Sequence, residues 1–212
     1  MDFQAGGFAS HAVVAIAVIL ILLISLSFHE FAHALVANLF GDPTAKLEGR
    51  LSINPIKHWD PIGTSLLVVL VALNSFGVPF PIFGWGKPVP VDERNFDNPR
   101  FYGLQTALAG PMSNLILALL LALAAKLFHL SGVALQVVDL AVYINIFLML
   151  FNLLPVPPLD GSRLLRIFLP EDIYLAIATN PVFFFIFIFV TIFFLLDYVM
   201  IFSTQITSFL LG

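Results

Sequence analysis

The stretch HAVVAIAVILILLISLSFHEFAHAL, residues 11–35, decides how the rest of the sequence is interpreted. Residues 11–26 contain no Asp, Glu, Lys or Arg, which is typical of a helix that crosses a lipid bilayer. His29, Glu30 and His33 follow within the same apolar run. A charged side chain inside a membrane costs a few kcal/mol, so such residues are rarely kept without a role. The first question is therefore why these three residues lie here.

The composition of the chain is that of an integral membrane protein. Of its 212 residues, 60% are apolar and 10% are charged, whereas soluble domains carry about 25% charged residues. We expect an all-α polytopic membrane protein that forms a single membrane-embedded domain over residues 1–212. The absence of cysteine excludes disulfides and thiolate metal sites. The net charge of −4, without a basic cluster, predicts no nucleic-acid partner.

Long apolar runs predict the membrane-spanning helices. A spanning helix needs about 20 apolar residues. The run at 62–78 is shorter and leads into NSFGVPFP, which breaks helices. We interpret it as a re-entrant or interfacial segment, with a short span as the alternative, so that the chain has about four to five transmembrane helices. The four long runs are 12–40, 101–128, 134–155 and 181–203.

The basic residues predict which connections lie in the cytoplasm. Three connections hold all but one of them, and Lys126 is the exception. By the positive-inside rule these three connections face the cytoplasm, which requires that 62–78 does not cross. If it does cross, one basic connection lies outside. The basic residues of the three connections are Lys46, Arg50, Lys57, Lys87, Arg94, Arg100, Arg163 and Arg166.

The connection TAKLEGRLSIN, residues 44–54, shows a period of two. Ala45, Leu47, Leu51 and Ile53 alternate with polar residues, which predicts a small membrane-associated β element. Its exposed edge could hold an extended peptide by strand addition. A surface loop that happens to alternate is the other interpretation.

His29 and His33 are spaced to bind one metal ion. Residues four apart share a helix face, so two imidazoles can bind the same zinc ion. Glu30, one step around the helix, can then act on a water molecule as a general base, the HExxH arrangement. The alternative is that all three are polar residues satisfied by neighbouring helices.

A catalytic zinc site usually has three protein ligands, so a third must come from elsewhere. His129, Asp139, Asp160 and Asp197 are the candidates in or near the membrane. Asp160 stands out because it follows 134–155 in NLLPVPPLDG, whose prolines end a helix and favour extended backbone. It could instead be a helix-capping or turn residue.

The direction of the spans gives a test of this choice. His29 and His33 can meet Asp160 only if 12–40 and 134–155 run in the same direction. This again requires that 62–78 does not cross. The site would lie about 10 Å below the inner end of the first helix, within the cytoplasmic leaflet.

Three motifs together resemble the site-2 protease family of intramembrane zinc metalloproteases. HEFAH resembles its zinc motif, NLLPVPPLDG its second motif, and ALAGPMSNLILAL, residues 107–119, its G-x-x-x-N element. The pieces FGDPTAKLEGRLSINPIKHWDPIGT and GWGKPVPVDERNFDNPR resemble the compact prokaryotic branch. We expect no PDZ-like insertion and no nucleotide-binding regulatory domain, both of which larger relatives carry.

The resemblance implies a function and a set of site residues. The protein would cut peptide bonds in or near transmembrane segments of single-pass membrane proteins in a prokaryotic inner membrane, with its site toward the cytoplasmic leaflet. His29, His33 and Asp160 would hold one zinc ion, and Glu30 would be the base. Asn152 and Asn114 would position the substrate or the oxyanion. Without the resemblance, Asn114 also fits a small-residue packing face and Asn152 a capping or interhelix hydrogen bond.

Two other classes of function remain open at this point. A membrane metal transporter places ionisable residues from several helices along a path. A catalytically inactive membrane binding protein could keep the metal site alone. A Glu30→Gln variant separates these from a protease, since only a protease would lose its activity while still binding zinc. The sequence does not indicate an oligomeric state.

Overall fold

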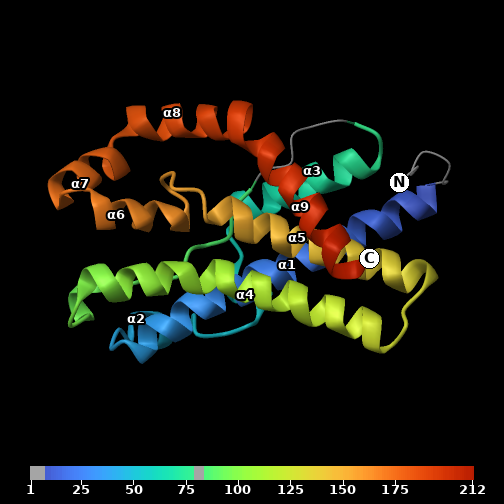
Figure 1. Cartoon of the computed structure of the whole chain (residues 1–212), viewed down its shortest axis with the longest axis horizontal. Helices are drawn as coiled ribbons and strands as arrows, with labels where there is room; N and C mark the ends of the chain where they lie inside the picture. Colours follow the sequence, from blue (N-terminus) through green and yellow to red (C-terminus); the bar gives the residue numbers. More distant parts are fainter. Residues whose placement is uncertain (1–7, 79–83) are drawn as a thin grey trace.

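The computed structural model describes residues 8–78 and 84–212, and within these ranges it is helical without strands. Four helical stretches are long and apolar enough to cross a membrane. The prediction of an all-α polytopic membrane protein with four long spans is therefore confirmed (Figure 1). These stretches are α1 (Phe8–Leu39), α4 (Pro99–Leu127), α5 (Gly132–Asn152) and the continuous run Pro181–Leu211.

The centre of the molecule is formed by α1, α4 and α5. In the view of Figure 1, α1 and α5 run from right to left, and α4 runs the opposite way and packs against both. Small residues on α4 allow α5 to pack closely, because short side chains bring helix backbones together in a membrane. Ala118 and Ala122 of α4 face Val142, Ile146 and Met149 of α5 in one buried cluster. Helices α1 and α5 run in the same direction, as expected if the predicted segments 12–40 and 134–155 share one site.

Asn-Pro pairs mark where two of the long helices begin. The Asn98 side chain accepts a hydrogen bond from the Phe101 backbone, and Pro99 is the first residue of α4. Asn180 and Pro181 begin α8 (Pro181–Val190) in the same way, with Val182 as the donor. An Asn cap satisfies a backbone N–H that has no partner in the helix. Pro is tolerated at the next position because a backbone N–H there would have no acceptor in the helix.

The last span is interrupted rather than regular. A π-helical turn, η5 (Thr191–Leu195), separates α8 from α9 (Leu196–Leu211). Helix α9 packs against α5 and α4, whereas α8 has no buried residue and extends away from the bundle along one edge (Figure 1). The predicted boundary of 203 is too short, because the helix continues to Leu211.

The segment 62–78 contains α3 (Gly63–Ser75), a helix of 13 residues packed against α1. At 1.5 Å per residue it is about 20 Å long, less than the roughly 30 Å of a bilayer core. The remaining short helices lie in the connections. They are α2 (Thr44–Leu47), η2 (Pro55–His58), η3 (Glu93–Asn95), η4 (Asp160–Leu164), α6 (Leu165–Phe168) and α7 (Glu171–Thr179).

The predicted β element at 45–54 is wrong. Residues 44–47 form α2, whose first turn is fixed by a hydrogen bond from the Thr44 N–H to the Asp42 carboxylate. Gly49, with a φ of +67°, then ends the turn in the left-handed region. The alternation of apolar and polar residues predicted that the apolar ones would be buried, but Leu47 is 80% exposed and Arg50 is only 4% exposed. This segment therefore offers no strand edge to a substrate.

Extended backbone instead follows α3. Residues 84–92, which we call the strap, have no regular secondary structure and lie between α3 and η3. The strap belongs to the Pro/Gly-rich stretch 79–100, of which residues 79–83 are outside the described residues.

Candidate metal centre

Three side chains, two from α1 and one from the 3-10 turn η4, converge on one point. His29 Nε2 lies 3.0 Å from His33 Nε2, and Asp160 Oδ2 lies 3.0 Å and 3.3 Å from these two atoms. Ligands of a tetrahedral zinc ion, each about 2.0–2.1 Å from the metal, lie roughly 3.3 Å apart. The three atoms are thus spaced as zinc ligands would be.

Local structure explains why these residues meet. The spacing of four places His29 and His33 on one face of α1, with Glu30 beside them. Asp160 begins η4, just beyond the end of α5. The turn that returns Asp160 to the histidines is tight, since a Cβ on Gly161 would lie 2.2 Å from the Leu153 carbonyl oxygen. The sequence predicted the end of the helix and extended backbone here, but residues 153–159 form turns and bends instead.

The hydrogen bonds of the two imidazoles direct their lone pairs toward this point. His33 Nδ1 lies 2.7 Å from the Thr106 carbonyl oxygen, which can only accept, so Nδ1 carries the proton. His29 Nδ1 lies 2.7 Å from Asn114 Oδ1. In their neutral form both imidazoles therefore present an unprotonated Nε2 to the Asp160 carboxylate. Three acceptors that face one another repel unless a cation lies between them, which is what a zinc ion would supply.

Gly110 of α4 leaves the room that such an ion needs. A Cβ on Gly110 would lie 2.3 Å from His33 Nε2 and 2.6 Å from His29 Nε2. The position is therefore open only because the residue is glycine. The donor set, its spacing and this opening all fit a bound zinc ion.

Charge also favours a cation at the site. Burial raises the pKa of the Asp160 carboxyl, but when protons rather than a metal lie on the Nε2 atoms, hydrogen bonds from His29 and His33 outweigh this and hold the pKa well below its usual value. Asp160 is thus a carboxylate at neutral pH, as a metal ligand must be.

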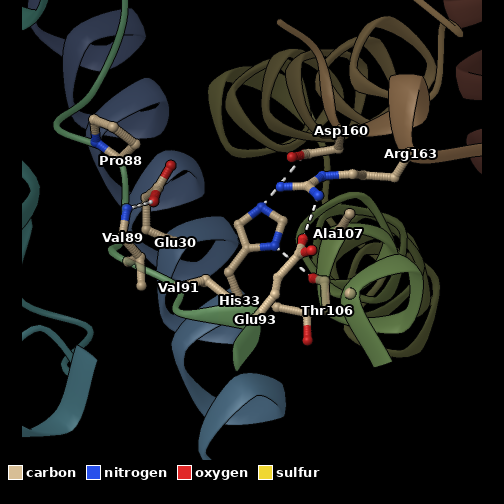
Figure 2. A pocket seen from close by; sticks show the side chains of 11 residues that line it. Glu30, His33, Pro88, Val89, Val91, Glu93, Thr106, Ala107, Asp160 and Arg163 are labelled. Carbon is tan, nitrogen blue, oxygen red and sulfur yellow. Dashed lines mark hydrogen bonds and ion pairs between the residues drawn. The ribbon is translucent and has the colours of Figure 1, made fainter. Parts of the chain in front are cut away.

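Glu30 points to a different neighbour. Its Oε2 accepts a hydrogen bond of 2.8 Å from the backbone N–H of Val89, in the middle of the strap (Figure 2). The strap is itself fixed on both sides of Val89. Arg50 Nη2 donates to the Lys87 carbonyl oxygen, and the Asp92 N–H donates to the Asp42 carboxylate.

A pocket of about 240 Å³ lies between these groups. Glu30, His33 and Asp160 line it together with Pro88, Val89 and Val91 of the strap (Figure 2). Glu93, which follows the strap, forms ion pairs with Arg163 and with Arg166, the latter at 2.7 Å. Since Arg163 follows Asp160 by three residues, these ion pairs join the end of the strap to the turn that carries Asp160.

The other predicted residues lie in different places. Asn114 is fully buried behind the imidazole of His29, and its amide group is engaged in hydrogen bonds. Asn152 is the last residue of α5, and its Nδ2 donates to the Leu148 carbonyl oxygen of the same helix. The alternative ligands His129, Asp139 and Asp197 do not belong to the group around His29.

Sequence reasoning missed several contributors. Gly110 is the glycine of the G-x-x-x-N element, but the sequence did not indicate that its missing side chain leaves room for a metal ion. The Thr106 carbonyl and the Val89 N–H are backbone groups, so no side-chain pattern could have identified them. Asn145 of α5 is also connected to His29, through a hydrogen bond with Asn114.

The fold and this cluster define the class of protein: a polytopic helical membrane protein with a buried His₂Asp centre suited to zinc and a glutamate beside it. Comparison with known proteins identifies the family. Residues 126–196, which include Asp160, match peptidase family M50. The chain is 42% identical over 164 residues to "Putative zinc metalloprotease YwhC" of Bacillus subtilis, covering 73% of this chain and 70% of that protein.

A second relative extends the likeness over more of the chain. "Putative zinc metalloprotease Rip2" of Mycobacterium tuberculosis is 32% identical over 184 residues, which are 85% of this chain and 68% of that protein. No solved structure matches significantly. The chain therefore belongs to peptidase family M50, the site-2 protease family.

Proposed function

We propose that this protein is an intramembrane zinc metalloprotease that hydrolyses peptide bonds in or near transmembrane segments of membrane-bound proteins. The convergence of His29 Nε2, His33 Nε2 and Asp160 Oδ2, beside Glu30 on a membrane-length helix, is the observation that carries the proposal. Membership of peptidase family M50 and the likeness to relatives named as zinc metalloproteases support it.

In this proposal His29, His33 and Asp160 hold one zinc ion. When bound, zinc polarises the carbonyl of a peptide bond and lowers the pKa of water toward 7. Glu30 takes the proton from the attacking water and later passes it to the leaving amine. The Val89 N–H holds the Glu30 carboxylate at the edge of the pocket, which keeps the base in reach of that water.

We assign the two asparagines different roles. Asn114 acts through His29, because its carbonyl oxygen accepts the Nδ1 proton and its side chain is fully buried. Asn152 remains the candidate for contact with the substrate or the oxyanion, since it is only partly buried and lies at the end of α5.

The substrate must be unwound before cleavage, because a helix hides its carbonyl groups in its own hydrogen bonds. The strap lines the pocket with Pro88, Val89 and Val91, so we propose that it forms one wall of the entrance for the unwound segment. We expect single-pass membrane proteins as substrates.

We place the centre in the cytoplasmic leaflet of a prokaryotic inner membrane. His33 lies six residues before the end of α1, or about 9 Å at 1.5 Å per residue. The basic residues follow the positive-inside rule in this orientation, with Lys126 at the opposite end of α4. The 13-residue length of α3 supports a segment that enters the membrane without crossing it.

A Glu30→Gln variant tests the proposed function against a metal transporter or an inactive binding protein. We expect the variant to bind zinc like the wild type but to lose cleavage by about a hundredfold or more, since a general base is removed. Glu48→Gln, the same change at an exposed position, is the matched control.

The measurement compares the membrane proteomes of cells that express each variant in place of the wild type. Uncleaved substrates should accumulate with Glu30→Gln and not with Glu48→Gln. Identical proteomes for Glu30→Gln and wild type, with zinc bound in both, would show that the protein is not a protease.

A further inference from the structure

A chain of buried side chains connects His29 to helix α5. Asn114 Nδ2 donates to Asn145 Oδ1 at 3.0 Å and to the Ser25 carbonyl oxygen at 3.3 Å. Asn145 Nδ2 in turn donates to Ser25 Oγ and to the Ala141 carbonyl oxygen, both at 2.9 Å. Ser25, Asn114 and Asn145 belong to α1, α4 and α5, so this relay joins the three central helices.

The direction of the relay is fixed by its ends. The Ala141 carbonyl can only accept, so the NH₂ group of Asn145 faces it and Oδ1 faces Asn114. The NH₂ group of Asn114 must then face Asn145 and the Ser25 carbonyl. This leaves Asn114 Oδ1 toward His29, so that Nδ1 of His29 carries the proton.

Burial makes an alternative arrangement costly. Ser25 and Asn145 are each 2% exposed and Asn114 is 0% exposed, at the depth of membrane-spanning helices. If the side-chain amide of Asn114 or Asn145 were rotated by about 180°, two acceptors or two donors would face each other, and no water is present at this depth to form hydrogen bonds with them. The relay therefore holds one state, and in that state Nε2 of His29 is free to bind a metal.

We propose that Asn145 and Ser25 are positioning residues of the metal centre: they orient Asn114, which sets the tautomer of His29. This inference rests on the proposed zinc site but concerns residues that touch neither metal nor substrate. His33 does not depend on the relay, because its Nδ1 lies against the Thr106 backbone. The two histidines therefore provide an internal comparison.

The first experiment measures zinc affinity of the purified full-length protein by competition with a chelator. Asn145→Leu should weaken binding about tenfold, which is the lower end of what loss of an outer-shell contact produces, and Ser25→Ala should weaken it by a few-fold. Ser25→Thr, which keeps the hydroxyl, should bind zinc like the wild type.

Ser203→Ala is the matched control for Ser25→Ala. Ser203 is 0% exposed on α9, and its hydroxyl donates only to the Val199 carbonyl of its own helix. Both changes remove one buried hydroxyl from a membrane helix, but only Ser25 is connected to His29. Equal loss of zinc affinity in the two alanine variants would mean a general packing effect and would overturn the proposal.

The second experiment records ¹⁵N spectra of the histidines in the zinc-free protein, at an alkaline pH at which both imidazoles are neutral. In the wild type both His29 and His33 should show the Nδ1–H tautomer. In Asn145→Leu, or in Ser25→Ala if the leucine variant does not fold, His29 should become a mixture while His33 is unchanged. An unchanged His29 would overturn the proposal, whereas a wild type that binds no zinc would instead overturn the proposed function.

Discussion

The pocket has two walls of different construction. On the helical wall, α1 and α4 present His33, Thr106 and Ala107 to the pocket, and the helix backbones satisfy their own hydrogen bonds. His29 and Gly110 lie next to His33 on these two helices. On the other wall the strap has no regular structure, and its backbone groups are held by side chains from elsewhere, such as Arg50 and Asp42. We infer that the helical wall determines metal affinity, whereas the strap determines the position of Glu30.

The largest effect that separates the two walls should come from Gly110→Ala. The new Cβ would occupy the space between His33 Nε2 and His29 Nε2, and the rings cannot retreat without breaking their contacts with Thr106 and Asn114. We expect zinc affinity to fall by about a hundredfold or more. The measurement is a zinc titration of the purified protein against a competing chelator.

Gly103→Ala is the control for this change. Gly103 lies on the same helix, and the nearest atoms to its added Cβ would be those of the Glu93 side chain, at 3.0 Å or more. It should keep its zinc affinity. A Gly110→Ala protein that binds zinc as tightly as Gly103→Ala would mean that the metal does not lie where the three ligand atoms converge.

The second prediction concerns the strap. Val89→Pro removes the N–H that holds Glu30, and the chain there already contains Pro88, so extended backbone is retained. A hydrogen bond to a charged group is worth about 1.5–3 kcal/mol, so cleavage should slow by about ten- to hundredfold. Zinc affinity should stay the same, which is the opposite pattern to that of Gly110→Ala.

The matched control is Val91→Pro, because the Val91 N–H donates to no residue in the described part of the chain. Cleavage of a membrane substrate found in the proteome comparison, measured in detergent at saturating zinc, gives the rates. If Val91→Pro slows cleavage as much as Val89→Pro, the effect comes from stiffening the strap and not from the contact with Glu30.

The helical wall could be predicted from the sequence more easily than the strap. A spacing of four on an apolar helix was enough to place His29 and His33 together, and the prolines before Asp160 indicated that the helix ends there. The strap could not be predicted, since its contacts use backbone groups and depend on Arg50 and Asp42, which are distant in sequence. The false strand at 45–54 had the same cause: alternation was read as one apolar face, although Arg50 is buried toward the strap.

The third prediction concerns the far end of the strap, where Asp42 accepts the Asp92 N–H. Burial raises the pKa of Asp42, but hydrogen bonds from the Thr44 and Asn95 side chains and from backbone N–H groups outweigh it and lower the pKa below its usual value. A group whose pKa is lowered by folding stabilises the protein above its unfolded pKa, and this contribution is lost as the pH falls through the folded value.

Asp42→Asn should therefore lower the free energy of unfolding at pH 7 by about 1–3 kcal/mol. The difference from wild type should shrink as the pH falls below about 4, the ordinary pKa of Asp. Thermal unfolding in detergent between pH 3 and pH 7 measures both. Asp97→Asn, at an exposed position in the same connection, should show no such difference at any pH.

The smallest effect should come from Arg50→Lys, which weakens the near end of the strap. Arg50 Nη2 lies 2.5 Å from the Lys87 carbonyl oxygen and 3.4 Å from that of Pro88, and the shorter side chain of lysine would not bring its ammonium group as close to these two oxygens. The positive charge is kept, so the buried site does not lose its cation. We expect the strap to open more often without unfolding the helices, because contacts of a non-helical segment are the first to break locally.

Hydrogen exchange measures this opening directly. The Val89 amide should exchange about tenfold faster in Arg50→Lys, while amides within α1 and α4 keep their protection. Zinc affinity should be unchanged and cleavage should change by less than about threefold, because the strap closes again between openings. Faster exchange throughout α1 would mean that Arg50 stabilises the helical wall as well, and the separation between the two walls would then be wrong.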